Sequence, residues 1–181
     1  MSAALLILAL ATAEPLTDAD VDRLPEPVIE DRVDILRPAR QGQVQCFQPD
    51  IDARTCKIMA AYSFEDDGRI VSTTQALMDE NGPAVLVVTA PVVVRGKAVC
   101  GGLEHLPTAR FVVAGQPATP GQESGYRMML SVAPRKGEVC ARWVGDGNGY
   151  VAYGSLDGKP KKDFDQRMIW VEPGEGYRVA P

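Results

Sequence analysis

One stretch of good alternation limits the fold of this chain more than any other feature. Every second residue over 56–64 falls on one face of an extended strand, as Cys, Ile, Ala, Tyr and Phe, with Lys57 and Ser63 on the other face. This period of two is typical of a half-buried β-strand. Acidic residues then lead to Gly68, which predicts a hairpin turn, and β-branched residues return over 69–77.

Short segments of similar character follow along the chain. Further strands are expected near residues 43–47, 84–90, 92–94, 98–100, 109–114, 138–144, 150–153 and 167–171. Pro91 is expected to bend its strand or to mark a sheet edge, because proline has no N–H to donate. Because some of these segments can belong to one bent strand, the sequence predicts about seven to nine short strands.

One segment carries a clear helix signal. The Thr-Pro-Gly-Gln motif at 119–122 combines an N-cap, a proline at the first helical position and a capping-box glutamine. Apolar residues follow at helical spacing up to Pro134: Tyr126, Met129, Leu130 and Ala133. With many strands and one helix, the expected class is mainly β or α+β. We expect a small antiparallel sheet or barrel-like domain with one helix, stabilised by disulfides.

The cysteines are four in number and widely spaced: Cys46, Cys56, Cys100 and Cys140. No CxxC pair is present, which excludes the usual zinc-ribbon and thioredoxin-like patterns. In an oxidising compartment, four such thiols usually form two bridges. Of the three connectivities, we favour Cys46–Cys56, which closes a short loop, with Cys100–Cys140, which closes a long one.

The N-terminal residues suggest export. Residues 3–11 are an unbroken apolar run, and a small-x-small pattern ends at Ala13. The run is much shorter than the roughly 20 residues that span a bilayer, so it fits a signal peptide over 1–13. The alternative is an N-terminal core helix, but the run has no polar face. We expect a periplasmic or secreted protein, cleaved near Ala13 and without a membrane span.

The rest of the chain divides at a change in character near Gly42. Residues 14–41 are rich in charge and proline and are interpreted as an extended N-terminal arm, and residues 42–181 as a single β-rich domain. The formal net charge is -5. An acidic chain with scattered basic residues gives no electrostatic reason to expect nucleic acid as a partner.

Catalytic motifs are scarce. The only histidine, His105, lies in what is expected to be a loop, so a His-rich metal site is excluded. The sequence contains no HExxH, GxSxG, P-loop or GxGxxG motif in a suitable setting. Asp146 begins a segment that fails the calcium-loop pattern at its fifth and sixth positions. We therefore predict no catalytic, cofactor-binding or metal-binding residue, although a pair of carboxylates remains open as a hydrolase site.

Aromatic residues gather in the last third of the chain. Tryptophan and tyrosine favour binding surfaces as well as cores. Packing in the core is the interpretation we favour for most of them. If the protein binds a partner here, the candidate binding surface comprises Trp143, Tyr150, Tyr153, Trp170 and Tyr177.

Several short motifs carry a resemblance. They are Val-Gln-Cys at 44–46, Thr-Cys at 55–56, Tyr62, Ala-Val-Cys-Gly-Gly at 98–102, Trp-Val-x-Pro at 170–173 and Gly-Tyr at 176–177. In these the chain resembles an uncharacterised family of small secreted four-cysteine proteins of Gram-negative bacteria. The resemblance runs from about residue 42 to the C-terminus. It implies export and the four-cysteine framework, and it implies no activity or site.

Three functions remain as hypotheses. The first is an exported, non-catalytic binding module or envelope-associated interaction module, whose partner is a protein or glycan of the cell envelope. The second is a secreted inhibitor of a hydrolase, because small disulfide-bonded β domains suit that role. The third is a carboxylate-based hydrolase that acts on envelope polymers.

Overall fold

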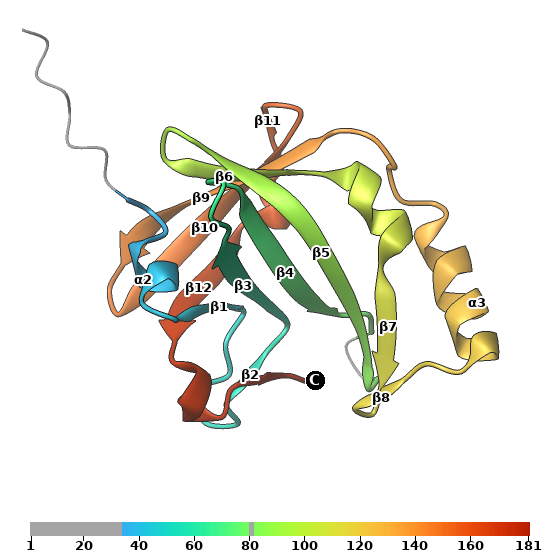
Figure 1. Cartoon of the computed structure of the whole chain (residues 1–181). Helices are drawn as coiled ribbons and strands as arrows, with labels where there is room; N and C mark the ends of the chain where they lie inside the picture. Colours follow the sequence, from blue (N-terminus) through green and yellow to red (C-terminus); the bar gives the residue numbers. More distant parts are fainter. Residues whose placement is uncertain (1–33, 80–81) are drawn as a thin grey trace, which may run out of the picture. The chain divides into compact units, whose positions relative to one another are not determined.

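The computed structural model of the chain describes residues 34–79 and 82–181 (Figure 1). The predicted signal peptide and residues 14–33 of the predicted arm lie outside this part. The elements begin with α2 (Arg37–Arg40), β1 (Val44–Phe47), β2 (Thr55–Cys56), β3 (Ile58–Phe64), β4 (Ile70–Leu77), β5 (Ala84–Arg95) and β6 (Ala98–Gly102). They continue with the 3-10 helix η1 (Leu103–Thr108), β7 (Arg110–Val113), β8 (Gln116–Pro117) and α3 (Pro120–Leu130). The last are β9 (Glu138–Asp146), β10 (Gly149–Leu156), β11 (Lys159–Pro160), η2 (Lys162–Phe164), β12 (Gln166–Val171), η3 (Pro173–Glu175) and β13 (Arg178–Val179).

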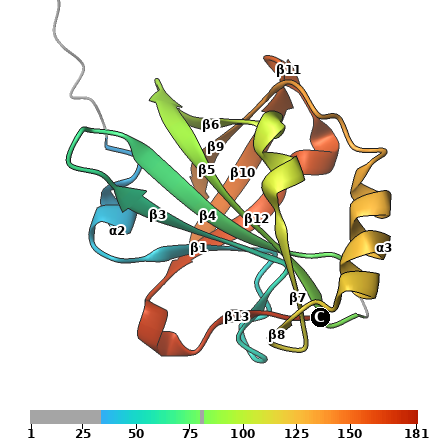
Figure 2. The ribbon, with the colours of Figure 1, turned by 45° about the vertical axis from the view of Figure 1, so that its right-hand side comes forward.

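Eight of these strands form a closed antiparallel barrel (Figures 1 and 2). In the order β1, β3, β4, β5, β6, β9, β10, β12, each strand pairs with the next, and β12 closes the ring by pairing with β1. The chain thus runs up and down around the barrel. Closure leaves no free edge among these eight strands. The expectation of a β-rich, disulfide-stabilised domain is confirmed, and the barrel is the correct form of the two that the sequence left open.

Strand β5 shows how the wall tolerates a proline. From the sequence, Pro91 is expected to bend its strand or to mark a sheet edge. In the structure, β5 continues through Pro91, which lies opposite Val71 of β4. On its other side, β5 pairs with β7 over residues 84–87 and with β6 over residues 92–95. Pro91 lies between these two pairings, where no strand requires its N–H. The proline therefore occupies a local edge inside a continuous strand.

One end of the barrel is closed by the short helix α2. Leu36 and Ala39 pack with Val99, and the surrounding aromatic and aliphatic side chains come from six strands: Phe64, Ile70, Val92, Val99, Trp143 and Trp170. Leu36 is fully buried. The guanidinium of Arg40 covers the Phe64 ring at 3.9 Å and binds Asp34 at 3.0 Å. Residues 34–41, which were predicted to belong to an extended arm, therefore form part of the compact domain.

A second cluster packs on the outside of the wall. Cys46, Cys56 and Val171 are buried there, and Tyr177 of the C-terminal tail covers them. The tail is held by a parallel pairing of β13 with β2. The bond between Cys46 and Cys56 lies within this cluster. Its loop-closure contribution to the free energy of unfolding is about 3 kcal/mol.

The second disulfide joins Cys100 and Cys140, which are directly opposite each other on β6 and β9. The two disulfides have the connectivity that the sequence favoured. Because the loop closed by Cys100–Cys140 is longer, the same model assigns it about 4 kcal/mol. Within that loop lie η1, β7, β8 and α3, which lead from one barrel strand to the next.

Helix α3 begins as predicted. The Thr119 side chain accepts from the Gln122 N–H, and the Gln122 side chain accepts from the Thr119 N–H, so the capping box is present. Its expected apolar face is not a core face, however, because none of its residues is buried. The helix is attached by the Tyr126 ring, which stacks on Phe111, and by Arg127, which donates to the carbonyls of Pro107 and Ala109. In the part of the chain that the structure describes, no helix has the length and apolarity needed to cross a membrane.

Candidate ligand-binding site

The interior of the barrel is hollow. A cavity of about 400 Å³ lies between its strands, and this volume is within the range of pockets that hold small ligands. Inward-facing side chains that would fill a solid core, such as Ile58, Leu86 and Val88, line the cavity and remain only partly buried. An eight-stranded barrel can be filled by its own side chains or can enclose one small ligand. This barrel is not filled by its own side chains.

Small residues at inward-facing positions create the hollow. Glycine or alanine lines the cavity on five of the eight strands: Ala60, Ala90, Gly101, Ala141, Ala152 and Gly154. Strand alternation repeats these short side chains on the inner surface. The cavity therefore follows from the composition of the inward face and does not depend on a gap in the wall.

Glycine at one of these positions admits an aromatic side chain. A side chain at Gly154 would collide with Phe164 of η2. The η2 turn is held against β10, because the Gly154 N–H donates to Asp165 at 3.2 Å and the Lys161 N–H donates to the Gly154 carbonyl at 2.9 Å. Phe164 lines the cavity and is still 38% exposed, so it borders both the hollow and the solvent.

Two sides of the cavity differ in chemistry. The side formed by β1, β3 and β4 carries the polar side chains of Gln45, Tyr62, Ser72 and Thr74. These strands are neighbours, and the register places Tyr62 opposite Ser72. The hydroxyls of Ser72 and Thr74 lie 3.3 Å apart and share a hydrogen bond. The side formed by β5, β6 and β9 is aliphatic apart from Trp143, with residues such as Leu86, Val88 and Val139.

Gln45 is the most deeply buried polar residue in this site. Its residue exposure is 1%, and its Oε1 accepts a hydrogen bond of 2.7 Å from the Tyr62 hydroxyl. Burial raises the pKa of Tyr62 well above its ordinary value, so this hydroxyl keeps its proton and remains a donor at neutral pH. The Gln45 Nε2 is buried and has no hydrogen-bond partner among the described residues. An unpaired buried polar group of this kind costs about 1–3 kcal/mol.

Charge is missing from the lining. None of the described residues that line the cavity is Asp, Glu, Lys, Arg or His. A buried ion without a partner is far more costly than a buried neutral polar group. The cavity is therefore suited to an uncharged molecule with a large apolar surface and a limited polar edge.

The five aromatic residues of the predicted binding surface do not form one surface. Trp143 lines the cavity, and Trp170 lies edge-on to it with ring centroids 6.1 Å apart, in the cluster around α2. Tyr150 is partly buried on β10. Tyr153 is 40% exposed beneath Arg142, and Tyr177 covers the outer cluster. Only Trp143 of this set borders the hollow.

Sequence reasoning did not identify the polar residues of the cavity. Gln45 entered only as part of a short motif, and Ser72 and Thr74 only as residues of a strand. A usable signal was present, because Ser72 and Thr74 share a strand face and both are polar where a solid core requires apolar side chains. The sole histidine, His105, lies on η1 with its Nε2 3.8 Å from Glu104 and does not line the cavity.

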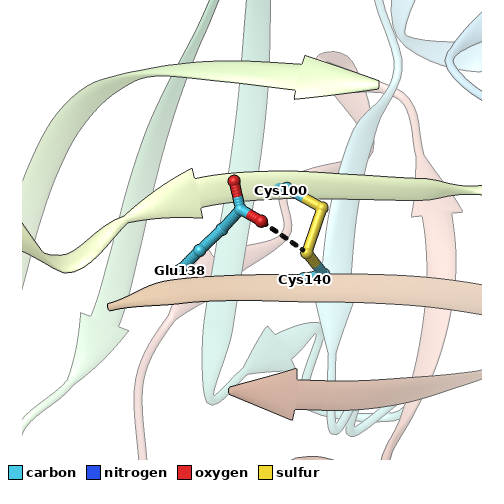
Figure 3. A group of neighbouring side chains, drawn as sticks. All are labelled: Cys100, Glu138 and Cys140. Atoms are coloured by element: carbon cyan, nitrogen blue, oxygen red, sulfur yellow. Dashed lines mark hydrogen bonds between the residues drawn. A yellow bond between two sulfur atoms is a disulfide. The ribbon is translucent and has the colours of Figure 1, made fainter. Parts of the chain in front are cut away.

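A second cluster of chemically active groups lies at the Cys100–Cys140 bridge (Figure 3). The Glu138 Oε2 lies 3.6 Å from Cys140 Sγ and 2.7 Å from Arg95 Nη1. A disulfide sulfur carries no proton, so the contact drawn between Glu138 and Cys140 is not a hydrogen bond in the oxidised protein. A metal would require thiolates from both cysteines. While the bridge is intact, these residues therefore form a structural bond beside a surface ion pair.

A larger hollow of about 550 Å³ lies outside the wall, between the C-terminal tail and residues such as Gln75, Val85 and Val87. No unpaired buried side-chain atom borders it in the described part of the chain, since the one such atom belongs to Gln45. The barrel interior is therefore the better candidate site. Comparisons of this chain with protein-family models, with curated proteins and with solved structures find no match.

Proposed function

We propose that the protein is an exported, non-catalytic binding protein that holds one small, largely apolar and uncharged molecule inside its barrel. One observation carries the proposal: the barrel interior contains a cavity of about 400 Å³, open to solvent, where side chains could have packed. Interiors of folded proteins are normally close-packed, and empty volume lowers stability. A ligand that fills the hollow restores these contacts.

Support for export comes from other features. The apolar run over 3–11 with its small-x-small end has the pattern of a signal peptide. The two disulfides fit an oxidising compartment. The binding proposal does not depend on either feature, so cavity binding and export can be tested separately.

The choice of a carrier over a hydrolase rests on the chemistry of the cavity. Hydrolysis by a carboxylate pair requires two such groups across a cleft. The described residues that line the hollow include none, and the polar residues present are amide and hydroxyl groups. These groups can orient a ligand, but none of them is a carboxylate that could attack it or transfer a proton to it.

The proposal is tested by titrating the purified protein with N-phenyl-1-naphthylamine, a neutral apolar dye that fluoresces in apolar surroundings. We expect saturable binding of one dye molecule per chain. Trp143 borders the cavity, so quenching of tryptophan fluorescence should accompany dye binding. Absence of saturable binding in both signals would overturn the proposal.

A matched pair of variants locates the dye. Ala90 lines the cavity, whereas its neighbour Thr89 is exposed and pairs its hydroxyl with Thr73 on the outside of the wall. Ala90→Phe places a ring in the hollow. It should weaken dye binding at least about tenfold, because the ring takes space in which the dye would bury its apolar surface. Thr89→Phe should leave the dissociation constant unchanged. Equal effects of the two substitutions would place the dye on the surface.

A further inference from the structure

We infer that the ligand carries a neutral oxygen acceptor, such as a ketone, ester or amide carbonyl, and that the Gln45 side-chain amide binds it. This inference rests on the proposed function and specifies the chemical class of the molecule. Its basis is the arrangement of Gln45 and Tyr62 on the polar side of the cavity.

The hydrogen bond from Tyr62 fixes the orientation of the Gln45 side-chain amide. Tyr62 has one hydroxyl proton and donates it to Gln45 Oε1 at 2.7 Å. This bond turns Oε1 toward β3 and leaves the Nε2 donor unpaired among the described residues. If the amide were rotated, Nε2 would donate to Tyr62 and Oε1 would become the unpaired atom, while the Tyr62 hydroxyl proton would lose its acceptor. The observed direction satisfies more groups, and the free group is a donor.

The charge of the ligand also affects its binding in this cavity. A carboxylate ligand would also accept from Nε2, but no described cationic side chain lines the cavity to balance it. Burial of an uncompensated ion is strongly unfavourable. A carbonyl oxygen makes the same hydrogen bond without this cost. The site therefore selects a neutral acceptor over an anion of the same shape.

The same cavity could also take an apolar ligand that has no hydrogen-bond acceptor. A ligand without an acceptor leaves the buried Nε2 donor unpaired. A ligand whose carbonyl reaches Nε2 pairs it. Discrimination arises because the buried donor is left unpaired by the wrong molecule, which is the strongest way for a site to reject an isostere.

The experiment compares three naphthalene derivatives of nearly equal shape in displacing N-phenyl-1-naphthylamine. 2-Acetylnaphthalene has a ketone oxygen, 2-isopropenylnaphthalene has a methylene in its place, and 2-naphthoate has a carboxylate. For the wild-type protein we expect the ketone to bind about fivefold to tenfold more tightly than the isopropenyl compound. The carboxylate should bind at least about tenfold more weakly than the ketone.

The double variant Gln45→Met with Tyr62→Phe removes both members of the pair and leaves no unpaired polar group behind. In this variant, the ketone and the isopropenyl compound should bind equally. Thr73→Val is the control, because Thr73 lies on β4 with its hydroxyl bonded to Thr89 on the outside of the wall. It should keep the wild-type preference.

The outcomes separate this inference from the proposed function. If the dye binds and the ketone and isopropenyl compounds displace it equally in the wild-type protein, the inference is wrong while the cavity still binds apolar molecules. Preferential binding of 2-naphthoate would also overturn it. If neither dye nor competitor binds the wild-type protein, the proposed function itself falls. The wild-type comparison needs no variant, so it remains decisive even if the double variant does not fold.

Discussion

The two ends of the barrel use the same strands in opposite ways. Around α2, six strands contribute large side chains to a packed cluster in which Leu36 is fully buried. Farther along the barrel, the same strands carry Ala60, Ala90 and Ala141 inward and leave a hollow. A strand such as β3 thus changes from Phe64 in the packed cluster to Ala60 beside the cavity within four residues.

This difference separates the part of the barrel that stabilises the fold from the part to which we assign binding. The packed end stabilises the fold by burying apolar surface, since burial of one large aliphatic side chain contributes about 1.5–3 kcal/mol. The hollow part lowers stability, since it forgoes packing and contains an unpaired amide donor. A protein selected only for stability would fill this space.

The largest effect is expected when the same substitution, leucine to alanine, is made at the packed end and at the cavity. Leu36→Ala removes a fully buried side chain and should lower the free energy of unfolding by about 3 kcal/mol. Leu86→Ala enlarges a cavity that already exists and should cost about 1 kcal/mol. Urea unfolding followed by tryptophan fluorescence measures both. Equal losses would show that the cavity wall is as tightly packed as the closed end.

A substitution at Gly154 tests how the hollow meets the solvent. Gly154→Val forces Phe164 away from β10 and should lower the free energy of unfolding by about 2 kcal/mol. It should also speed dissociation of the naphthylamine dye, measured by stopped-flow fluorescence. The matched control is Gly145→Val on β9, where an added side chain meets open space. A control that destabilises as much as Gly154→Val would remove the assigned role of Phe164.

A substitution on the polar side of the cavity is expected to raise the free energy of unfolding, whereas the substitutions above lower it. Replacing Gln45 by Met together with Tyr62 by Phe removes the unpaired donor and its hydrogen-bond partner, so we expect the ligand-free protein to become about 1 kcal/mol more stable. Denaturant unfolding without any added ligand measures this gain. A clear loss of stability would mean that the pair contributes to folding, and the contrast between the two ends would weaken.

The smallest effect concerns alkaline pH. Because burial raises the pKa of Tyr62 in the folded protein, the unfolded chain loses this proton first as the pH rises above about 10. Stability from this group is complete below that pH and falls above it, by at most about 1.4 kcal/mol per pH unit. Tyr62→Phe should show a shallower decline, measured by unfolding at a series of alkaline pH values. Parallel declines would place the Tyr62 hydroxyl in contact with water.

Sequence reasoning succeeded where the cause of structure is local. The alternation over 58–64, the turn at Gly68, the Thr119 capping box and the two disulfides all appear in the structure. Cys56, which was expected on the same face as Ile58, instead belongs to β2 and packs in the outer cluster. Sequence reasoning failed where the cause is distant. Closure depends on β12 returning to β1, and continuation of β5 through Pro91 depends on the strands that flank it. The cavity depends on inward positions of all eight strands, which no single window of sequence contains.

The Cys100–Cys140 bridge has a consequence for how this protein can vary. It joins β6 to β9 at the base of the segment that contains η1, β7, β8 and α3, with a sequence separation of 40. A peptide bond cut within that segment would leave the two halves of the barrel covalently attached. Insertions near the exposed residues Met128, Met129 and Val132 are likewise isolated from the barrel strands. The bridge thus makes the α3 region a place where new sequence can be added while the barrel and its cavity stay whole.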